Sequence, residues 1–420
     1  MTASRVESPT RSRWKIRLLA TAAVIGPGLL AGLSDDDPPG ITTYSVLGAE
    51  YGYQLLWVLL LSTLALIAFH TLAVRLGVVT SQGLIGLVRD RYGPRVGGMA
   101  LLLLLIANLG TTCAELAGVA AGSELFGVSR NLSVPLVAVG VTTLVLKGAF
   151  HRVEHVLMAL AAAFVSYVIA GYVVHPDWGE AARGLVVPSM PVTRESVLIV
   201  TATVGTTLAP WGLSFIQSYA VDKRLRVADL RFERIDVVVG SILTGVIGFF
   251  VVVTCAATLH VQHISVESAA DAASALEPLA GTYARLLFGV GILGAALLAA
   301  AILPLSTAYS VCEFTGREGG LNDGFRRAPF FYGTYVFMIG LAAAVVLIPG
   351  ISLVPVLVLT QVLNAILLLP LMVLMYRLAR DRRLMGDHAV QAAASAVYAF
   401  TIGLIGLCVA ALLVISLRAG

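Results

Sequence analysis

The sequence is poor in charged residues. Of its 420 residues, 12% are Asp, Glu, Lys or Arg, whereas 58% are hydrophobic, and the mean hydropathy is +0.91. Soluble domains carry about 25% charged residues, so this composition argues against a soluble globular fold. Apolar stretches of about twenty residues recur along the whole chain, and each can cross a hydrocarbon core of about 30 Å. The composition therefore predicts an all-α protein that spans a membrane many times.

Cysteine is also scarce, and metal-binding motifs are missing. Cys113, Cys255, Cys312 and Cys408 stand singly in apolar stretches without CxxC spacing, which is typical of packing residues. There is no HExxH motif or Cys/His cluster, and apart from His70, at the inner end of the second span, the histidines lie in or near predicted connections. A zinc enzyme is therefore not expected. No nucleic-acid-binding motif occurs, so no nucleic acid partner is expected.

Eleven membrane spans are predicted. The N-terminal stretch is basic and then apolar, as in a secretory signal, but it leads into an acidic stretch without an A-x-A cleavage site. Residues 1–16 are therefore expected to form a cytoplasmic tail. The spans are predicted at 17–50, 54–74, 95–122, 132–148, 153–174, 195–221, 235–259, 282–312, 328–348, 352–376 and 390–417.

Lys and Arg are distributed unevenly between the connections. Most of the 28 lie in the N-terminal tail and in every second connection after it. The exceptions are Arg130, Arg183, Arg194, Arg418 and, near a span end, Arg285. By the positive-inside rule, the N-terminus is expected in the cytoplasm and the C-terminus outside the inner (plasma) membrane. The basic clusters are thus interpreted as determinants of topology.

The first and sixth spans each contain a proline interruption. Pro38 and Pro39 break the first span, and Pro210 breaks the sixth, five spans later. Because five is odd, a second five-helix unit enters the bilayer upside down. Interrupted helices at matching positions of two inverted repeats mark the substrate site of a transporter. The predicted organisation is a ten-helix core at 17–376, with repeats at about 17–174 and 195–376, followed by a loop and an eleventh helix at 377–420.

The first break carries three consecutive acids. Pro38 and Pro39 have no N–H, so the carbonyls of Ser34 and Asp35 lose their helical partners. Proline also disfavours helical backbone at the preceding residue, Asp37. An unpaired carbonyl inside a bilayer is costly unless it lines a cavity or binds an ion. The sequence therefore offers loose carbonyls and carboxylates suited to a cation.

The second break adds to this set, because Pro210 frees the carbonyl of Thr206. A new helix over 41–50 is expected to begin just after Gly40. The alternative interpretation is that the acids form a loop at the outer end of the first span, with the last of them near a helix start. The acidic stretch 264–280 is either an interfacial helix or a plain connection.

The third predicted span contains a polar stripe. Asn108, Thr111, Thr112 and Glu115 recur at helical spacing, and no span offers Glu115 a central Lys or Arg. An unpaired acid inside a membrane is a functional-site hypothesis by default, and the alternative is a protonated glutamate packed against hydroxyls. Similar stripes comprise Thr203, Thr206 and Thr207 in span six and Thr360, Gln361 and Asn364 in span ten. Each stripe alone also fits helix–helix hydrogen bonding.

These motifs resemble the NRAMP family of divalent-metal transporters. The likeness comprises Gly26–Gly28, Asp37–Gly40 and Gly52–Trp57 around the first break, Thr112–Glu115 in span three, and Thr206–Trp211 at the second break. The resemblance implies a LeuT-like inverted repeat of five plus five helices and an eleventh helix, with helices 1 and 6 interrupted. It also implies alternating access by movement of these two helices against the others.

The departures from the family motifs are informative. Gly40 stands where the family has Asn, Ala209 where it has Met, Trp211 where it has His, and Thr112 where it has Asp. A thioether favours transition metals, whereas Mg²⁺ prefers oxygen and keeps several waters. The pattern is similar to the NRAMP-related magnesium transporter branch, which implies Mg²⁺ and also Mn²⁺ as substrates. The missing His and acidic positions imply uptake without proton coupling.

The sequence thus predicts a transporter rather than an enzyme, with Mg²⁺ or Mn²⁺ as transported substrate and no cofactor or obligate protein partner. The expected metal ligands are Asp36, Asp37, Glu115, Thr206, Ala209 and Gly40. The expected pathway residues are Asp35, Thr112, Gln361, Asn364 and Trp211. The alternatives are a proton-coupled Mn²⁺/Fe²⁺ importer, an organic-solute symporter of the same fold, and an intramembrane hydrolase with paired acids.

Overall fold

The computed structural model describes residues 31–32, 34–147, 164–317, 319–320 and 324–419. Within these residues the chain is helical and contains no β-strand. The helices are α3 (Pro38–Tyr51), α4 (Leu56–Thr80), α5 (Leu84–Tyr92), α6 (Pro94–Glu124), α7 (Arg130–Leu146), α9 (Val165–Val173), α10 (Trp178–Val186), α11 (Arg194–Thr207), α12 (Pro210–Asp222), α13 (Leu230–Cys255), α14 (Ala269–Ser274), α15 (Glu277–Ala280), α16 (Ala284–Thr315), α17 (Pro329–Val346), α18 (Leu353–Arg380), α19 (Arg382–Met385) and α20 (Ala392–Ala419).

The described residues contain eight helical segments that are long and apolar enough to cross a membrane. They coincide with the second, third and sixth to eleventh predicted spans. The fourth predicted span is α7, a shorter apolar helix. The predicted spans 17–50 and 153–174 lie partly outside the described residues, and α3 and α9 are their described ends.

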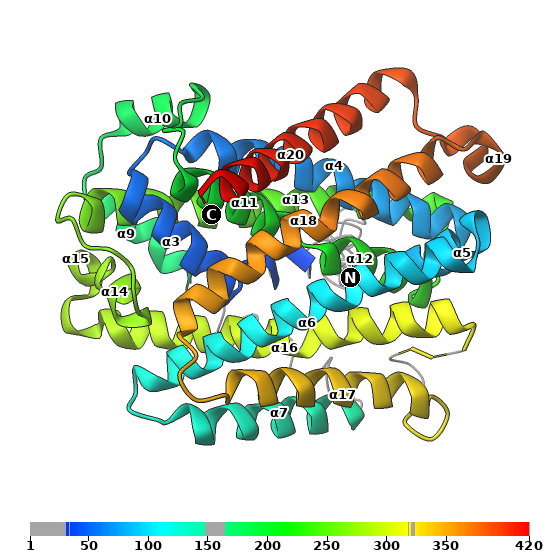
Figure 1. Ribbon diagram of the computed structural model, residues 1–420, viewed down its shortest axis with the longest axis horizontal. Coiled ribbons are helices and arrows are strands. Elements are labelled where there is room, and N and C mark those ends of the chain that lie inside the picture. Colours follow the sequence, from blue (N-terminus) through cyan, green and yellow to red (C-terminus); the bar gives the residue numbers. More distant parts are fainter. Residues whose placement is uncertain (1–30, 33, 148–163, 318, 321–323, 420) are drawn as a thin grey trace, which may run out of the picture.

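The interrupted sixth span lies at the centre of the bundle. In Arg194–Asp222, which comprises α11 and α12, 94% of the apolar window is buried, whereas in α20 only 22% is. Figure 1 shows α6, α7, α16 and α17 on one side of these helices and α4, α13 and α20 on the other. The helix α3 packs against both α11 and α13, so the two interrupted spans are neighbours.

Four connections contain short helices, and only the one over 264–280 was predicted, as one of two alternatives. The helix α5 follows α4, α10 precedes α11, and α19 follows α18. The stretch 264–280 forms the short helices α14 and α15 rather than a plain connection. The helix α14 begins with a capping box in which the Ser268 hydroxyl and the Asp271 carboxylate each accept a backbone N–H. Its neighbour Leu276 is fully buried, so this stretch packs onto the bundle.

The cysteines pack as predicted. All four are free thiols; Cys113, Cys255 and Cys312 are buried, and Cys408 is half-buried. They lie within or against two apolar clusters that together fill the bundle. Their role is therefore packing, as expected for isolated cysteines in apolar segments.

Candidate metal-binding site

The first membrane span is interrupted at Asp36 and Asp37. The helical backbone ends at Asp35, the next two residues bend, and α3 starts directly afterwards. Asp37 has an extended backbone and caps α3, because its Oδ1 accepts a hydrogen bond of 2.7 Å from the Gly40 amide. The prediction that the new helix begins after Gly40 is therefore wrong. The two prolines occupy its first positions, where a missing N–H costs nothing.

The sixth span is interrupted at the predicted proline. The helix α11 ends at Thr207 and α12 begins at Pro210. Between them, Ala209 has an extended backbone with φ −79° and ψ 140°. Its carbonyl accepts a long hydrogen bond of 3.2 Å from the Gly212 amide. A carbonyl has two lone pairs, so this oxygen retains capacity for a further partner.

The two breaks meet at Gly40. A Cβ atom built on this residue would lie 2.8 Å from the carbonyl oxygen of Asp35 and 3.0 Å from Asp37 Oδ1. The same position lies 3.4 Å from Thr206 Oγ1, which belongs to α11. A carbonyl, a carboxylate and a hydroxyl from two interrupted spans thus surround one residue without a side chain.

The helix α6 brings a further acid to the first break. The carboxyl group of Glu115 lies close to that of Asp37. This approach is possible because Gly118, one turn further along α6, leaves room for the ring of Pro38; a Cβ atom there would overlap the ring. Glu115 is fully buried, and neither of its oxygens receives a hydrogen bond of good geometry from a described residue.

The charge around the breaks is strongly negative. Asp35, Asp36, Asp37 and Glu115 expose 2%, 2%, 5% and 0% of their surface. No lysine or arginine is buried in the described part of the chain. Asp35 Oδ2 and both carboxylate oxygens of Asp36 have no hydrogen-bond partner among the described residues. Because isolated buried carboxylates are very costly, this cluster requires protons or a cation.

The acids do not form a complete metal site by themselves. Within the described residues, no three Asp, Glu, His or Cys side chains form a group that could hold a metal. Asp37 and Glu115 therefore offer two carboxyl groups, and other ligands must be neutral oxygens. One candidate is Thr206 Oγ1, which is buried and has no described hydrogen-bond partner. Carbonyls and waters would complete a set of the kind that Mg²⁺ binds.

Several of the other polar stripe residues connect helices. Asn108 Nδ2 donates to a threonine of α16 over 2.9 Å, and Asn364 Nδ2 donates over 2.9 Å to Gln361 Oε1 and to Thr111 Oγ1. Thr112 Oγ1 donates within α6, to the carbonyl of Asn108 over 2.6 Å. The contacts of Asn108 and of Asn364 with Thr111 match the helix–helix alternative. A pathway role for Thr112, Gln361 and Asn364 stays a prediction.

Two aromatic side chains lie beside the second break. Trp211 is buried, and its Nε1 has no hydrogen-bond partner among the described residues. His70 of α4 was not predicted as a site residue, yet it is buried, and its Nε2 lies 3.2 Å from where a Cβ atom of Gly212 would be. It was expected at the inner end of the second span, but α4 continues to Thr80, so His70 lies well inside the helix. The signal available in the sequence was a lone histidine in an otherwise apolar span.

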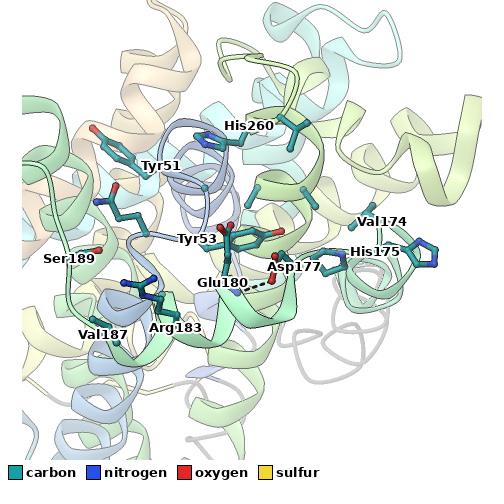
Figure 2. A pocket seen from close by; sticks show the side chains of 17 residues that line it. Tyr51, Tyr53, Val174, His175, Asp177, Glu180, Arg183, Val187, Ser189 and His260 are labelled. Carbon is teal, nitrogen blue, oxygen red and sulfur yellow. Dashed lines mark hydrogen bonds between the residues drawn. The ribbon is translucent and has the colours of Figure 1, made fainter.

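Cavities lie at both ends of the interrupted helices. At the end of α3 is a cavity of about 540 Å³, around which Figure 2 shows Tyr51, Tyr53 and His260. At the end of α12 is one of about 280 Å³, lined by Asp222 and Glu313 among others. The helix α4, with 25 residues and a length of about 37 Å, runs from the first cavity to the second. Since α3 and α12 have 14 and 13 residues, the breaks lie about 20 Å from either end.

A membrane bundle in which two interrupted helices meet over buried acids has the architecture of a LeuT-like transporter. Sequence comparison defines the family. The profile described as "Natural resistance-associated macrophage protein-like" (Nramp) matches residues 28–415, and the chain belongs to this family. Members of the family are metal transporters and not enzymes, and the metal is their substrate rather than a cofactor, as predicted.

Several curated relatives are similar along most of their length. The divalent metal cation transporter MntH of Granulibacter bethesdensis is 28% identical over 411 residues, which cover 93% of this chain and 88% of the relative. The protein of the same name from Acidiphilium cryptum is 29% identical over 394 residues, which cover 91% of this chain and 87% of the relative.

Solved structures confirm the fold. The manganese transporter of Eremococcus coleocola superposes with a TM-score of 0.76 at 19% identity, covering 99% of this chain and 89% of the other. Mhp1, a nucleobase-cation-symport-1 family transporter, superposes with a TM-score of 0.58 at 17% identity, covering 94% and 91%. The predicted LeuT-like fold is therefore correct.

Proposed function

We propose that this protein imports Mg²⁺, and also Mn²⁺, by alternating access and without proton coupling. The observation that carries the proposal is the meeting of two helix breaks at Gly40, where the nearest atoms are all oxygens. The names of the curated relatives support a divalent metal as substrate.

The ligand chemistry favours a hard cation. In this proposal Asp37 is the principal ligand, Glu115 acts directly or through water, and Asp36 acts through water. The thioether and imidazole positions of the family motif hold Ala209 and Trp211, so neither offers a soft or nitrogen ligand to the ion. Oxygen donors suit Mg²⁺ and Mn²⁺ better than the softer transition metals.

The interrupted helices give the ion a route to both sides. The larger cavity at the end of α3 would be the outer vestibule, and the cavity at the end of α12 the inner one. At the inner end, Glu313 of α16 accepts hydrogen bonds from Ser218 of α12 and the Ile85 amide of α5. Gln217 of α12 also donates to the Gln82 carbonyl over 3.0 Å. Opening toward the cytoplasm would require these contacts to separate.

The orientation in the inner membrane follows from the distribution of charge. The ends of α4, α12 and α18 that carry the Arg-rich connections would face the cytoplasm, by the positive-inside rule. This orientation places the N-terminus inside and the C-terminus outside.

Uptake is expected to follow the membrane potential and not the pH gradient. An inside-negative potential supplies about 2.3 kcal/mol per charge per 100 mV, hence about twice that for a divalent ion. In proteoliposomes loaded with a Mg²⁺-sensitive dye, a potassium diffusion potential should accelerate uptake several-fold, while an imposed pH gradient should leave it unchanged. Proton entry in fixed ratio to metal would contradict this prediction and favour the proton-coupled alternative. His70→Ala would then test the buried imidazole as proton carrier.

Metal selectivity is expected to depend on Ala209. Replacing it with methionine adds a thioether beside the breaks, which favours Mn²⁺ and Cd²⁺ over Mg²⁺. The expected result is a change of about tenfold in the Mn²⁺-to-Mg²⁺ uptake ratio, equivalent to about 1.4 kcal/mol. The control Ala209→Leu adds similar volume without sulfur and should lower uptake of both ions equally. Equal uptake ratios in the two variants would show that the side chain of residue 209 does not reach the ion, and would contradict an ion bound beside this break.

The remaining alternatives have less support. An organic-solute symporter shares the fold, as the likeness to Mhp1 illustrates, but three buried aspartates at the break would repel a substrate carboxylate. The intramembrane hydrolase is excluded by family membership. Manganese transport with proton coupling is the main competitor.

A further inference from the structure

A groove of about 710 Å³ lies on the membrane-facing side of the bundle, away from the helix breaks. Its walls come from α4, the start of α13, α20 and the connection before α20. These elements meet at the end of the bundle that carries the Arg-rich connections, which we call the basic end. Neither the site at the breaks nor its two vestibules contribute to this groove.

The polar part of the groove is positively charged. Arg75, Arg231 and Arg234 line it together with one acid, Asp387, and His388. Within the described residues, none of the three arginines forms an ion pair with a carboxylate. Arg75 instead donates a long hydrogen bond of 3.5 Å to the buried Tyr398 hydroxyl. Three guanidinium groups facing one cavity form a site for a planar or tetrahedral oxyanion.

The groove continues into an apolar one. A second groove of about 150 Å³ between α4, α11 and α20 is lined by aliphatic and aromatic side chains, with two hydroxyls and a thiol. The two grooves share Leu64 and Val397, each 54% exposed. The outer face of α20 also exposes Phe400 and Leu407 by 64% and 67%, as expected for a helix in contact with lipid. A surface with a positively charged groove that continues into an apolar groove is complementary to an amphipathic ligand with a negatively charged end.

We propose that this surface binds an anionic phospholipid. The phosphate lies among Arg75, Arg231 and Arg234, and one acyl chain passes Leu64 and Val397 into the apolar groove. Arginines at the end of a membrane helix attract anionic headgroups. The lipid would cover the face of α20, whose apolar window is only 22% buried within the protein, and so fix this helix against α4.

The test compares an anionic with a zwitterionic lipid on the full-length protein. Protein is reconstituted in nanodiscs of equal phosphatidylglycerol and phosphatidylcholine, released, and the retained lipids are measured by native mass spectrometry. Wild type should retain phosphatidylglycerol at least tenfold over phosphatidylcholine, since each arginine contributes about fivefold. The variant Arg231→Gln/Arg234→Gln should lose most of this preference. Equal retention of both lipids by wild type would overturn the proposal.

One control variant tests whether general surface charge explains the lipid preference. A second variant tests the position of the acyl chain, and a competitor tests whether the arginines bind free phosphate instead. Arg382→Gln/Arg383→Gln removes two exposed arginines of α19 at the same end but outside the groove, and should keep the preference. If it loses the preference as fully, general surface charge is responsible and the site is refuted. Val397→Trp blocks the passage between the grooves and should also lower retention; unchanged retention refutes the acyl-chain position. Millimolar inorganic phosphate should not displace the lipid, and displacement would assign the arginines to free phosphate.

Discussion

Asp37→Asn is expected to reduce Mg²⁺ and Mn²⁺ uptake to background, at least a hundredfold below wild type, while the protein remains folded. Asparagine keeps the oxygen that caps α3 through the Gly40 amide, so the helix start is preserved. It removes the negative charge that faces Glu115 and the second break. A divalent ion that leaves water for a buried site needs that charge, because neutral oxygens alone do not repay its hydration.

The measurements are dye-reported uptake in proteoliposomes and isothermal titration of the purified protein with each ion. Thermal unfolding checks that the variant folds. Asp229 provides a matched control, since its carboxylate also accepts a hydrogen bond from a backbone amide, that of Arg226 over 2.9 Å, but lines neither cavity of the transport route. Asp229→Asn should bind and transport normally. If Asp37→Asn transports as well as this control, Asp37 is only a helix cap and the proposed site is wrong.

The helix breaks could be predicted from proline together with its surroundings, and not from proline alone. The missing N–H groups at Pro38 and Pro210 disrupt helical hydrogen bonding, and both breaks occur where expected. Other prolines lie inside the continuous helices α7, α16 and α18, so the adjacent acids at the first break and the matching position five spans later were needed for the prediction. The start of α3 was predicted after Gly40 instead of at Pro38. The preference of proline for the first helical position would have given the correct start. The short helices α5 and α10 have only nine residues each, so a criterion of about twenty apolar residues per membrane span could not indicate them.

The contacts between segments that are distant in the sequence could not be predicted as well. A polar stripe on α6 could be seen in the sequence, but spacing does not tell which member faces another helix and which faces the break. In the structure Asn108 and Thr111 bond to neighbouring helices, and Glu115 faces Asp37. What decides this is the close approach of Gly118 to Pro38, a contact between residues eighty apart. Only tertiary packing determines such a contact.

Gly40→Ala is expected to abolish transport and to destabilise the protein. By helix propensity alone, replacing this glycine of α3 with alanine would raise the free energy of unfolding by about 1 kcal/mol. The structure predicts the opposite sign, because the new Cβ atom would lie 2.8 Å from the Asp35 carbonyl oxygen, a backbone atom that cannot simply rotate away. Shifting α3 away from the Asp35 carbonyl to relieve this overlap should cost about 1–3 kcal/mol and displace the Asp37 carboxylate from Thr206.

Gly340 of α17 provides the control for Gly40→Ala, since it is exposed in a helix and a Cβ atom there would meet nothing within 4 Å. Gly340→Ala should leave uptake unchanged and raise the midpoint of thermal unfolding slightly. Gly40→Ala should lower that midpoint by several degrees and remove metal binding in titration calorimetry. If Gly40→Ala instead raises the midpoint and still binds metal, the breaks do not meet at this residue. The close packing of oxygens around Gly40, on which the ion-binding proposal depends, would then be incorrect.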